Sequence, residues 1–556
     1  WGVDPNAKTP AVRLEDGKDY VPTNGWTVFA HQFSSIAGAG PVTGAIQAAA
    51  FGWLPVLLWV LIGGVFFGAV TDFGALYASV KNDGKSMGLL IEKYIGKTGR
   101  KLFLLFCWLF CGIVIAAFAD MVAGTFNAFD AEGAQVEAAF ANGAAGMVSI
   151  MFMVFAVVFG FIQKKFNFSG WREAVIGIVF IVLSFAVGMN FPLVFGKTAW
   201  SYITFVYIFF AAVLPMWMLK QPRDYMTTFM FGAMIAGAVI GLLVAHPTMN
   251  LPVFTGFNNA KLGTMFPILF VTVACGAVSG FHSLVSSGTS SKTVENEKDM
   301  LKVGYGAMVL ESLLAVLALC VAGAAAAADG TPATGTPFQI FSRGVAGFFE
   351  MFGVPVSIAT VFMTMCVSAL ALTSLDAVAR IGRMSFQELF SVDDMEHAEG
   401  WRKLCCNVYF STFITLVFGF ILTQIGYANI WPLFGSANQL LSALVLATLC
   451  VFLKVTGRNN KMLFPPLVIM LCVTFTALVQ RLIAMVKAIS AAASTAIPAG
   501  ETTWGAVFIA NGLQLILAVL LIVLGLNIVF HSVKSYTTCD APEAKDNAKA
   551  TAKANA

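Results

Sequence analysis

Residues 29–47 read FAHQFSSIAGAGPVTGAIQ, and this stretch decides the fold because it is apolar enough for a membrane yet unable to stay helical. Gly38 and Gly40 support a helix poorly and Pro41 lacks a backbone N–H, so we expect the helix to unwind or kink there. Unpaired backbone groups in lipid cost several kcal/mol each, so such a break survives only inside protein or beside a wet cavity. We therefore assign six candidate substrate-binding residues here: His31, Gln32, Ser34, Ser35, Gly38 and Gly40.

The surrounding chain has the composition of a membrane protein. Of its 556 residues, 58% are hydrophobic and only 11% are charged, whereas soluble domains carry about 25% charged residues. We count about 14 apolar runs long enough to cross roughly 30 Å of hydrocarbon. They lie near 26–52, 53–79, 100–127, 142–163, 172–192, 199–219, 225–245, 265–285, 303–327, 353–378, 405–425, 432–454, 464–487 and 505–532. The expected fold is an all-α polytopic membrane protein.

The distribution of positive charge supports this topology. Lys and Arg near span ends stay on the cytoplasmic side. Most of the 33 Lys and Arg fall in alternate loops and the two ends, the exceptions being Lys197, Lys261, Arg343, Arg481 and Lys487. We therefore expect both ends to be cytoplasmic. The expected parts are an N-terminal segment (1–25), a transmembrane core (26–390), C-terminal transmembrane helices (391–535) and a disordered tail (536–556).

A second predicted span is broken like the first. Residues 274–292 read ACGAVSGFHSLVSSGTSSK, with glycines among hydroxyls and a histidine. The two broken spans lie seven apart and so run in opposite directions, as inverted repeats around a central site require. Kinks at Gly and Pro also arise from packing alone, but two polar breaks favour the site. Its further candidate substrate-binding residues are Gly276, Ser279, Gly280, His282 and Ser283.

Acidic residues inside spans are costly and tend to mark function. Glu311 lies roughly 12 Å into its span with no basic neighbour on its own helix, and Asp72 lies about two turns above a cytoplasmic end. We assign both as ion-coupling residues. Asp376 precedes Arg380 by four residues, so we expect a local ion pair there.

Other polar residues in the spans leave two readings open. His31 and His282 fit either neutral core histidines or a role toward substrate or proton. Asn438 and Gln439 fit either interhelical hydrogen bonding or the lining of a substrate cavity. We include all four among the candidate substrate-binding residues.

The sequence lacks the motifs of several other function classes. It has no Walker loop, H-E-x-x-H helix or G-x-S-x-G elbow, so an enzyme is not expected and any energy source would be an ion gradient. The ten cysteines show no C-x-x-C pair, and we expect structural thiols with no metal site. We expect no cofactor and no nucleic-acid partner.

Six motifs carry a family resemblance: SIAGAGP (35–41), LPMWMLKQPRDY (214–225), FVTVACGAVSGFHSLVSSGTSSK (270–292), GYGAMVLES (304–312), ALTSLDAVARIGR (371–383) and IWPLFGSANQLLSAL (430–444). Together they resemble the carbon starvation protein CstA family over about residues 1–455. The resemblance implies a LeuT-like broken-helix transporter of the bacterial inner membrane, with residues 26–390 as its transporter core, for peptides or, as in the related BtsT branch, for pyruvate with protons. It also implies a further hydrophobic segment upstream of Trp1.

The resulting hypothesis is a secondary active transporter that imports a small carboxylate, pyruvate or short peptides, by proton symport. Sodium is the alternative coupling ion, since hydroxyls and carbonyls also suit a hard cation. A metabolite channel or a membrane sensor without coupled transport is the alternative function. Membrane lipid surrounds the protein in each case, and the sequence leaves its oligomeric state open.

Overall fold

The computed structural model describes residues 1–17, 19–130, 132–166, 170–215, 217–260, 262–392, 399–494 and 504–539. These residues form a helical bundle with one two-stranded hairpin, in which Asn258–Asn259 (β1) pairs antiparallel with Gly263–Thr264 (β2). Residues 540–556 of the predicted tail lie outside the described residues, and residues 536–538 belong to the last helix.

The helices of the first half, including short 3₁₀ and π segments labelled η, are α1 (Pro10–Arg13), α2 (Gly25–Ile36), α3 (Ala39–Ala48), η1 (Ala49–Phe51), α4 (Trp53–Ile62), η2 (Gly63–Gly68), α5 (Ala69–Val80), α6 (Met87–Tyr94), α7 (Lys97–Phe126), α8 (Ala139–Phe166), α9 (Trp171–Asn190), α10 (Lys197–Val213) and α11 (Lys220–Ala245). Those of the second half are α12 (Met265–Thr272), α13 (Ala274–Ala277), α14 (Gly280–Gly288), η3 (Ser290–Lys292), η4 (Glu297–Asp299), η5 (Leu301–Gly306), α15 (Ala307–Ala325), α16 (Pro337–Glu350), α17 (Val356–Phe390), α18 (Gly400–Cys405), α19 (Val408–Thr423), α20 (Tyr427–Val455), η6 (Lys461–Leu463), α21 (Phe464–Ser494) and α22 (Trp504–Thr538).

Ten continuous helical runs among the described residues are long and apolar enough to cross a membrane. They establish a multi-pass membrane protein. Four of the predicted spans fall outside this set: α10 and α19 are shorter apolar helices, and the other two are interrupted. The predicted number of spans therefore stays a prediction.

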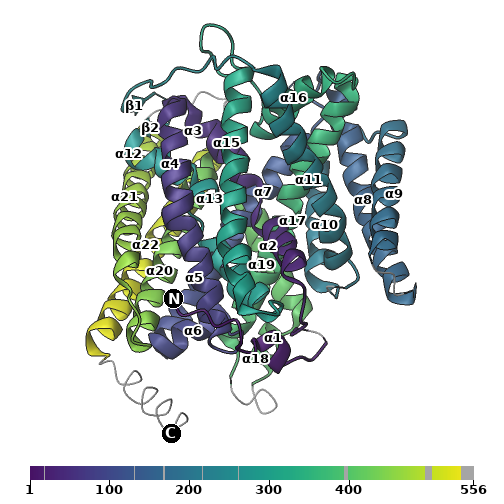
Figure 1. Cartoon of the computed structure of the whole chain (residues 1–556). Coiled ribbons are helices and arrows are strands. Elements are labelled where there is room, and N and C mark those ends of the chain that lie inside the picture. The colour runs from purple at the N-terminus through teal and green to yellow at the C-terminus, as the bar shows by residue number, and fades with distance from the viewer. Residues whose placement is uncertain are drawn as a thin grey trace.

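Helix α16 does not correspond to any predicted span, and neither do the shorter helices α1, α6 and α18. Helix α16 begins with a capping box in which the Thr336 side chain accepts from the Gln339 N–H and the Gln339 side chain accepts from the Thr336 N–H. The helix packs on α11, α15 and α17. In Figure 1 it lies at one end of the bundle, where it covers the ends of longer helices.

Both predicted helix breaks are present in the structure. The first lies at Ala37–Gly38, just before Pro41, which occupies the first turn of α3 where its missing N–H leaves no intrahelical bond unmade. The second has two steps, at Val273 and at the extended residues Val278–Ser279. Each broken span therefore consists of half-helices that meet inside the bundle.

The two breaks lie side by side. Helix α3 packs on α13 and α15, while α14 packs on α5 and α20. A Cβ added to Gly40 would overlap Cys275 of α13, so only glycine allows this approach. Figure 1 shows α3 and α4 running beside α15, with α21 and α22 flanking them on one side and α8 and α9 standing at the far side. The N-terminus, α1, α6 and α18 gather at one end of the bundle, and β1, β2 and α16 at the other.

Candidate functional site

A pocket lies where the two breaks meet, and we call it the break pocket. Residues of α2, α7, α13, α14, α17 and α20 line it, together with Gly38 at the first break. Its aromatic lining is Phe110, Phe118, Phe281 and Phe434; its polar lining is Cys275, Ser374 and Asn438; the remainder is Ile36, Gly38, Val114 and Val378. The cavity is small, about 10 Å³ or room for one water molecule, and mostly apolar, with its few polar groups close to the helix interruptions.

Asn438 holds the second break together. Its Oδ1 accepts from the Phe281 N–H at 3.1 Å and from Ser279 Oγ at 3.2 Å. Its Nδ2 lies 3.3 Å from Cys275 Sγ and 3.0 Å from Ser279 Oγ. Because α14 begins at Gly280, this carboxamide satisfies one of the N–H groups that a helix start leaves unpaired. The side chain thus both lines the pocket and caps α14.

The first break has no such cap. Gly38 precedes α3 and offers no side-chain acceptor, so the N–H groups of Ala39 and Gly40 lie ahead of the first intrahelical hydrogen bond. Ser374 of α17 faces Gly38, and a Cβ on Gly38 would overlap its Oγ. The Ser374 hydroxyl is buried and has no hydrogen-bond partner among the described residues.

His282, which follows Phe281, belongs to a buried cluster of Asp72, His282 and Glu311 that we call the central triad. His282 Nδ1 lies 2.9 Å from Asp72 Oδ2, and His282 Nε2 lies 3.1 Å from Glu311 Oε2. The three side chains come from α5, α14 and α15, and all are 0% exposed. Asp72 Oδ1 and Glu311 Oε1 have no hydrogen-bond partner within the described part of the chain.

The triad is unbalanced in charge. One imidazolium between two carboxylates leaves a net charge of about −1, and an uncompensated buried charge is strongly unfavourable. One more proton makes the group neutral. Groups in such close contact share protons and titrate together rather than independently. The arrangement is therefore chemically able to take up and release a proton in the middle of the bundle.

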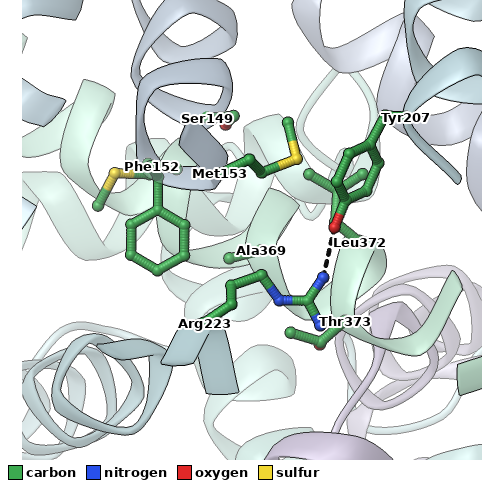
Figure 2. Close-up of a pocket in the computed structure, with 9 residues that line it drawn as sticks. Ser149, Phe152, Met153, Tyr207, Arg223, Ala369, Leu372 and Thr373 are labelled. Atoms are coloured by element: carbon green, nitrogen blue, oxygen red, sulfur yellow. Dashed lines mark hydrogen bonds between the residues drawn. The ribbon is translucent and has the colours of Figure 1, made fainter. Parts of the chain in front are cut away.

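A second charged cluster, the arginine cluster, consists of His31, Tyr207, Arg223, Asp224 and Asp376. Arg223 pairs with Asp376 and, at 3.0 Å, with Asp224; His31 Nδ1 lies 3.4 Å from Asp224 Oδ2. The Tyr207 hydroxyl donates to Asp376 Oδ2 at 2.8 Å and accepts from Arg223. Figure 2 shows Arg223 and Tyr207 joined in this way at the edge of a small pocket that Ser149, Phe152, Met153 and Thr373 also line.

This cluster corrects one prediction. The sequence predicts that Asp376 pairs with Arg380 on its own helix, but it pairs with Arg223 of α11 instead. The Arg380 guanidinium donates at 2.6 Å to the carbonyls of Ala211 and Leu214, where α10 ends. Carbonyl groups at a helix end attract a cation, so Arg380 is drawn away from the acid four residues before it.

The other predicted site residues take various positions. Gln32 bridges to α14 and η3, donating to Ser286 Oγ at 2.8 Å and accepting from Ser290 Oγ. Ser34 donates to the His31 carbonyl at 3.2 Å, whereas the buried hydroxyls of Ser35 and Ser283 have no partner among the described residues. Gln439 donates to the Phe270 carbonyl at 2.7 Å, an interhelical bond.

The predicted glycines share one property, which is close packing. A Cβ added to Gly276 would overlap Ala315, and a Cβ added to Gly280 would overlap the backbone of α20. The structure thus brings Gly38, Gly40, Ser279 and Asn438 together around the break pocket. His31 and Gln32 instead connect α2 to its neighbours.

Sequence reasoning missed several residues. Ser374 and Cys275 line the pocket but were not named, although both lie inside motifs that were singled out. Arg223 was also missed because it lies at the start of its span, where a positive charge looks like an ordinary cytoplasmic flank. No sequence spacing linked Asp72, His282 and Glu311, since 210 residues separate Asp72 from His282.

Comparisons with known proteins give the family. The protein-family model described as "Carbon starvation protein CstA" matches residues 1–330 and 324–477. The peptide transporter CstA of Escherichia coli K12 is 30% identical over 85% of this chain and 76% of its own length. The pyruvate/proton symporter BtsT of the same organism is 37% identical over 58% of this chain and 45% of its own length.

A solved structure agrees with the fold alone. A manganese transporter of Eremococcus coleocola, bound to an aromatic bis-isothiourea substituted compound, aligns with a TM-score of 0.50 at 10% identity. The alignment covers 94% of this chain and 99% of that one. With the family model and the curated relatives covering most of its length, the chain belongs to the carbon starvation protein CstA family.

Proposed function

We propose that this chain is a secondary active transporter, not an enzyme, that imports a small carboxylate nutrient, pyruvate or a short peptide, by proton symport. One observation carries the proposal. Phe281 lines the break pocket, and the next residue, His282, contacts both buried acids of the central triad. The break pocket, as the proposed substrate site, and a proton-holding group therefore share the first turn of α14.

The coupling follows from charge. Without an extra proton the triad is negative, and it disfavours an anion in the adjacent pocket. Once the triad gains one proton it becomes neutral, so the anion binds more readily, and by linkage the bound anion favours the proton. Proton and anion then cross together because each stabilises the other in the same closed state.

The membrane arrangement forms part of the same proposal. We place about 14 spans in a LeuT-like inverted repeat, with both ends on the cytoplasmic side of the inner membrane, on the strength of the alternating Lys and Arg. The two interrupted helices then meet near the midplane. Alternating access would open the break pocket first to one side and then to the other.

The proposed substrate and the proposed coupling ion are inferred from the relatives. Their names include peptide transport and pyruvate/proton symport, and both substrates carry a carboxylate. Sodium is the alternative ion, and a channel or sensor the alternative function. A channel would equilibrate its solute without accumulating it, and a sensor would bind without any flux.

The test is uptake of radiolabelled pyruvate into proteoliposomes of purified protein, with a proton gradient, with a sodium gradient, and with neither. We expect accumulation that requires the proton gradient and falls when unlabelled pyruvate competes, and competition by unlabelled L-alanyl-L-alanine tests the peptide as substrate. Labelled dialanine is run in parallel. Downhill equilibration alone would favour the channel, and absence of flux for both solutes by folded protein would overturn the transporter.

A further inference from the structure

The two half-helix starts at the break pocket are not equivalent. Asn438 occupies the start of α14, where its Oδ1 accepts from the Phe281 N–H at 3.1 Å. The start of α3 has no such cap, because its N-cap is Gly38. An incoming carboxylate would have to displace Asn438 to reach α14, whereas the first N–H groups of α3 have no intrahelical acceptor and suit an anion.

A second, independent observation points to the same place. Ser374 is 2% exposed, lines the break pocket and lies against Gly38, yet its hydroxyl has no hydrogen-bond partner among the described residues. A buried hydroxyl without a partner is costly. A carboxylate oxygen at the start of α3 would give that hydroxyl an acceptor.

The described lining of the break pocket limits which charged groups the substrate can carry in addition to its carboxylate. None of the described residues that line the break pocket is Asp, Glu, Lys, Arg or His. Once the central triad is protonated and neutral, the α-ammonium of an amino acid or peptide would be desolvated there with no carboxylate in the described lining to pair with, a strongly unfavourable situation. Four phenylalanine rings also line this cavity of about 10 Å³, and so little space favours a short apolar group over a second peptide unit.

We propose that Ser374 and the α3 start bind the carboxylate of a small monocarboxylate without an ammonium group, and that Asn438 directs it there by occupying the start of α14. This rests on the proposed function, which it narrows from carboxylate nutrients in general to the pyruvate type. The described lining of the pocket offers no cation to neutralise the substrate. The proton taken up by the central triad therefore supplies the compensating positive charge.

The test measures binding by tryptophan fluorescence or calorimetry with four probes: pyruvate, L-lactate, L-alanine and L-alanyl-L-alanine. We expect the purified wild-type protein to bind pyruvate and lactate and to bind the two ammonium-bearing probes at least about tenfold more weakly. Ser374→Ala should weaken pyruvate binding about tenfold, the loss of one hydrogen bond to a charged group.

Two further variants separate a binding role from a structural one. Ser368→Ala is the matched control, since Ser368 is another buried, unpartnered hydroxyl in the described part of α17 but does not line the break pocket; it should leave binding unchanged. Asn438→Asp keeps the acceptor for Phe281 but adds a negative charge. It should weaken pyruvate binding about 100-fold and shift preference toward alanine.

The outcomes are distinct. Equal pyruvate affinity in Ser374→Ala and Ser368→Ala, with both proteins folded by size exclusion and melting, would overturn the role of Ser374. Preference of the wild type for dialanine or alanine would overturn the substrate class but leave proton-coupled carboxylate transport standing. Failure of every probe to bind or accumulate would reject the proposed function itself.

Discussion

The central triad and the arginine cluster both contain two carboxylates and a histidine, but only the second contains its own strong cation. In the arginine cluster Arg223 contacts both acids, and Lys220 lies one turn before Asp224 on α11. In the central triad, His282 is the one basic side chain of the described residues that pairs with Asp72 and Glu311. Removing one partner of a buried ion pair strongly destabilises the fold, whereas buried carboxylates that outnumber the cations beside them favour the uptake of a proton.

The largest expected effect comes from removing the cation of the balanced cluster. Arg223→Met leaves Asp376 and Asp224 buried without their shared partner, which we expect to cost about 3–5 kcal/mol of folding stability. Thermal melting of detergent-purified protein and membrane yield measure it. Arg343→Met, at an exposed arginine of α16, is the control and should behave like the wild type. A normal melting temperature for Arg223→Met would show that this cluster does not hold the bundle together.

The next effect comes from neutralising the unbalanced cluster. Glu311→Gln fixes the triad in the charge state it would have with a bound proton, so we expect gradient-driven pyruvate accumulation to fall about 100-fold while pyruvate counterflow persists. Uptake and counterflow in the same proteoliposomes measure this, with Glu350→Gln on exposed Glu350 as the control. If Glu311→Gln destabilised the protein as much as Arg223→Met, the two clusters would not differ in their contribution to folding stability.

These two clusters also show how far sequence alone could go. Both helix breaks were predictable, because glycines and hydroxyls grouped inside an apolar span disfavour a continuous helix. The individual members Asp72, His282 and Glu311 could be flagged by their cost in lipid. Their contact could not be predicted, since it depends on packing among α5, α14 and α15. The local pairing rule failed for Arg380 because the carbonyls at the end of α10 compete for its guanidinium.

The pH dependence of binding sharpens the comparison. The anion prefers the triad with its extra proton, so the bound state holds more protons than the free state, and affinity for pyruvate rises as pH falls. The slope is at most about tenfold per pH unit for one proton. Titration of pyruvate binding across neutral pH measures it. Glu311→Gln should flatten the slope, whereas a slope that survives in that variant would place the coupling proton elsewhere.

The smallest expected effect concerns His31, which the sequence suggested as a substrate ligand. The structure places its ring 3.4 Å from Asp224, with the side chain 20% exposed, and it is absent from the described lining of the break pocket. Partly exposed pairs of this kind contribute about 1 kcal/mol or less. His31→Gln should therefore lower the melting temperature slightly and leave pyruvate affinity within about threefold of the wild type. A loss of affinity as large as that of Ser374→Ala would instead mean that His31 contacts the substrate in another conformation of the transport cycle. The arginine cluster and the central triad would then belong to one site.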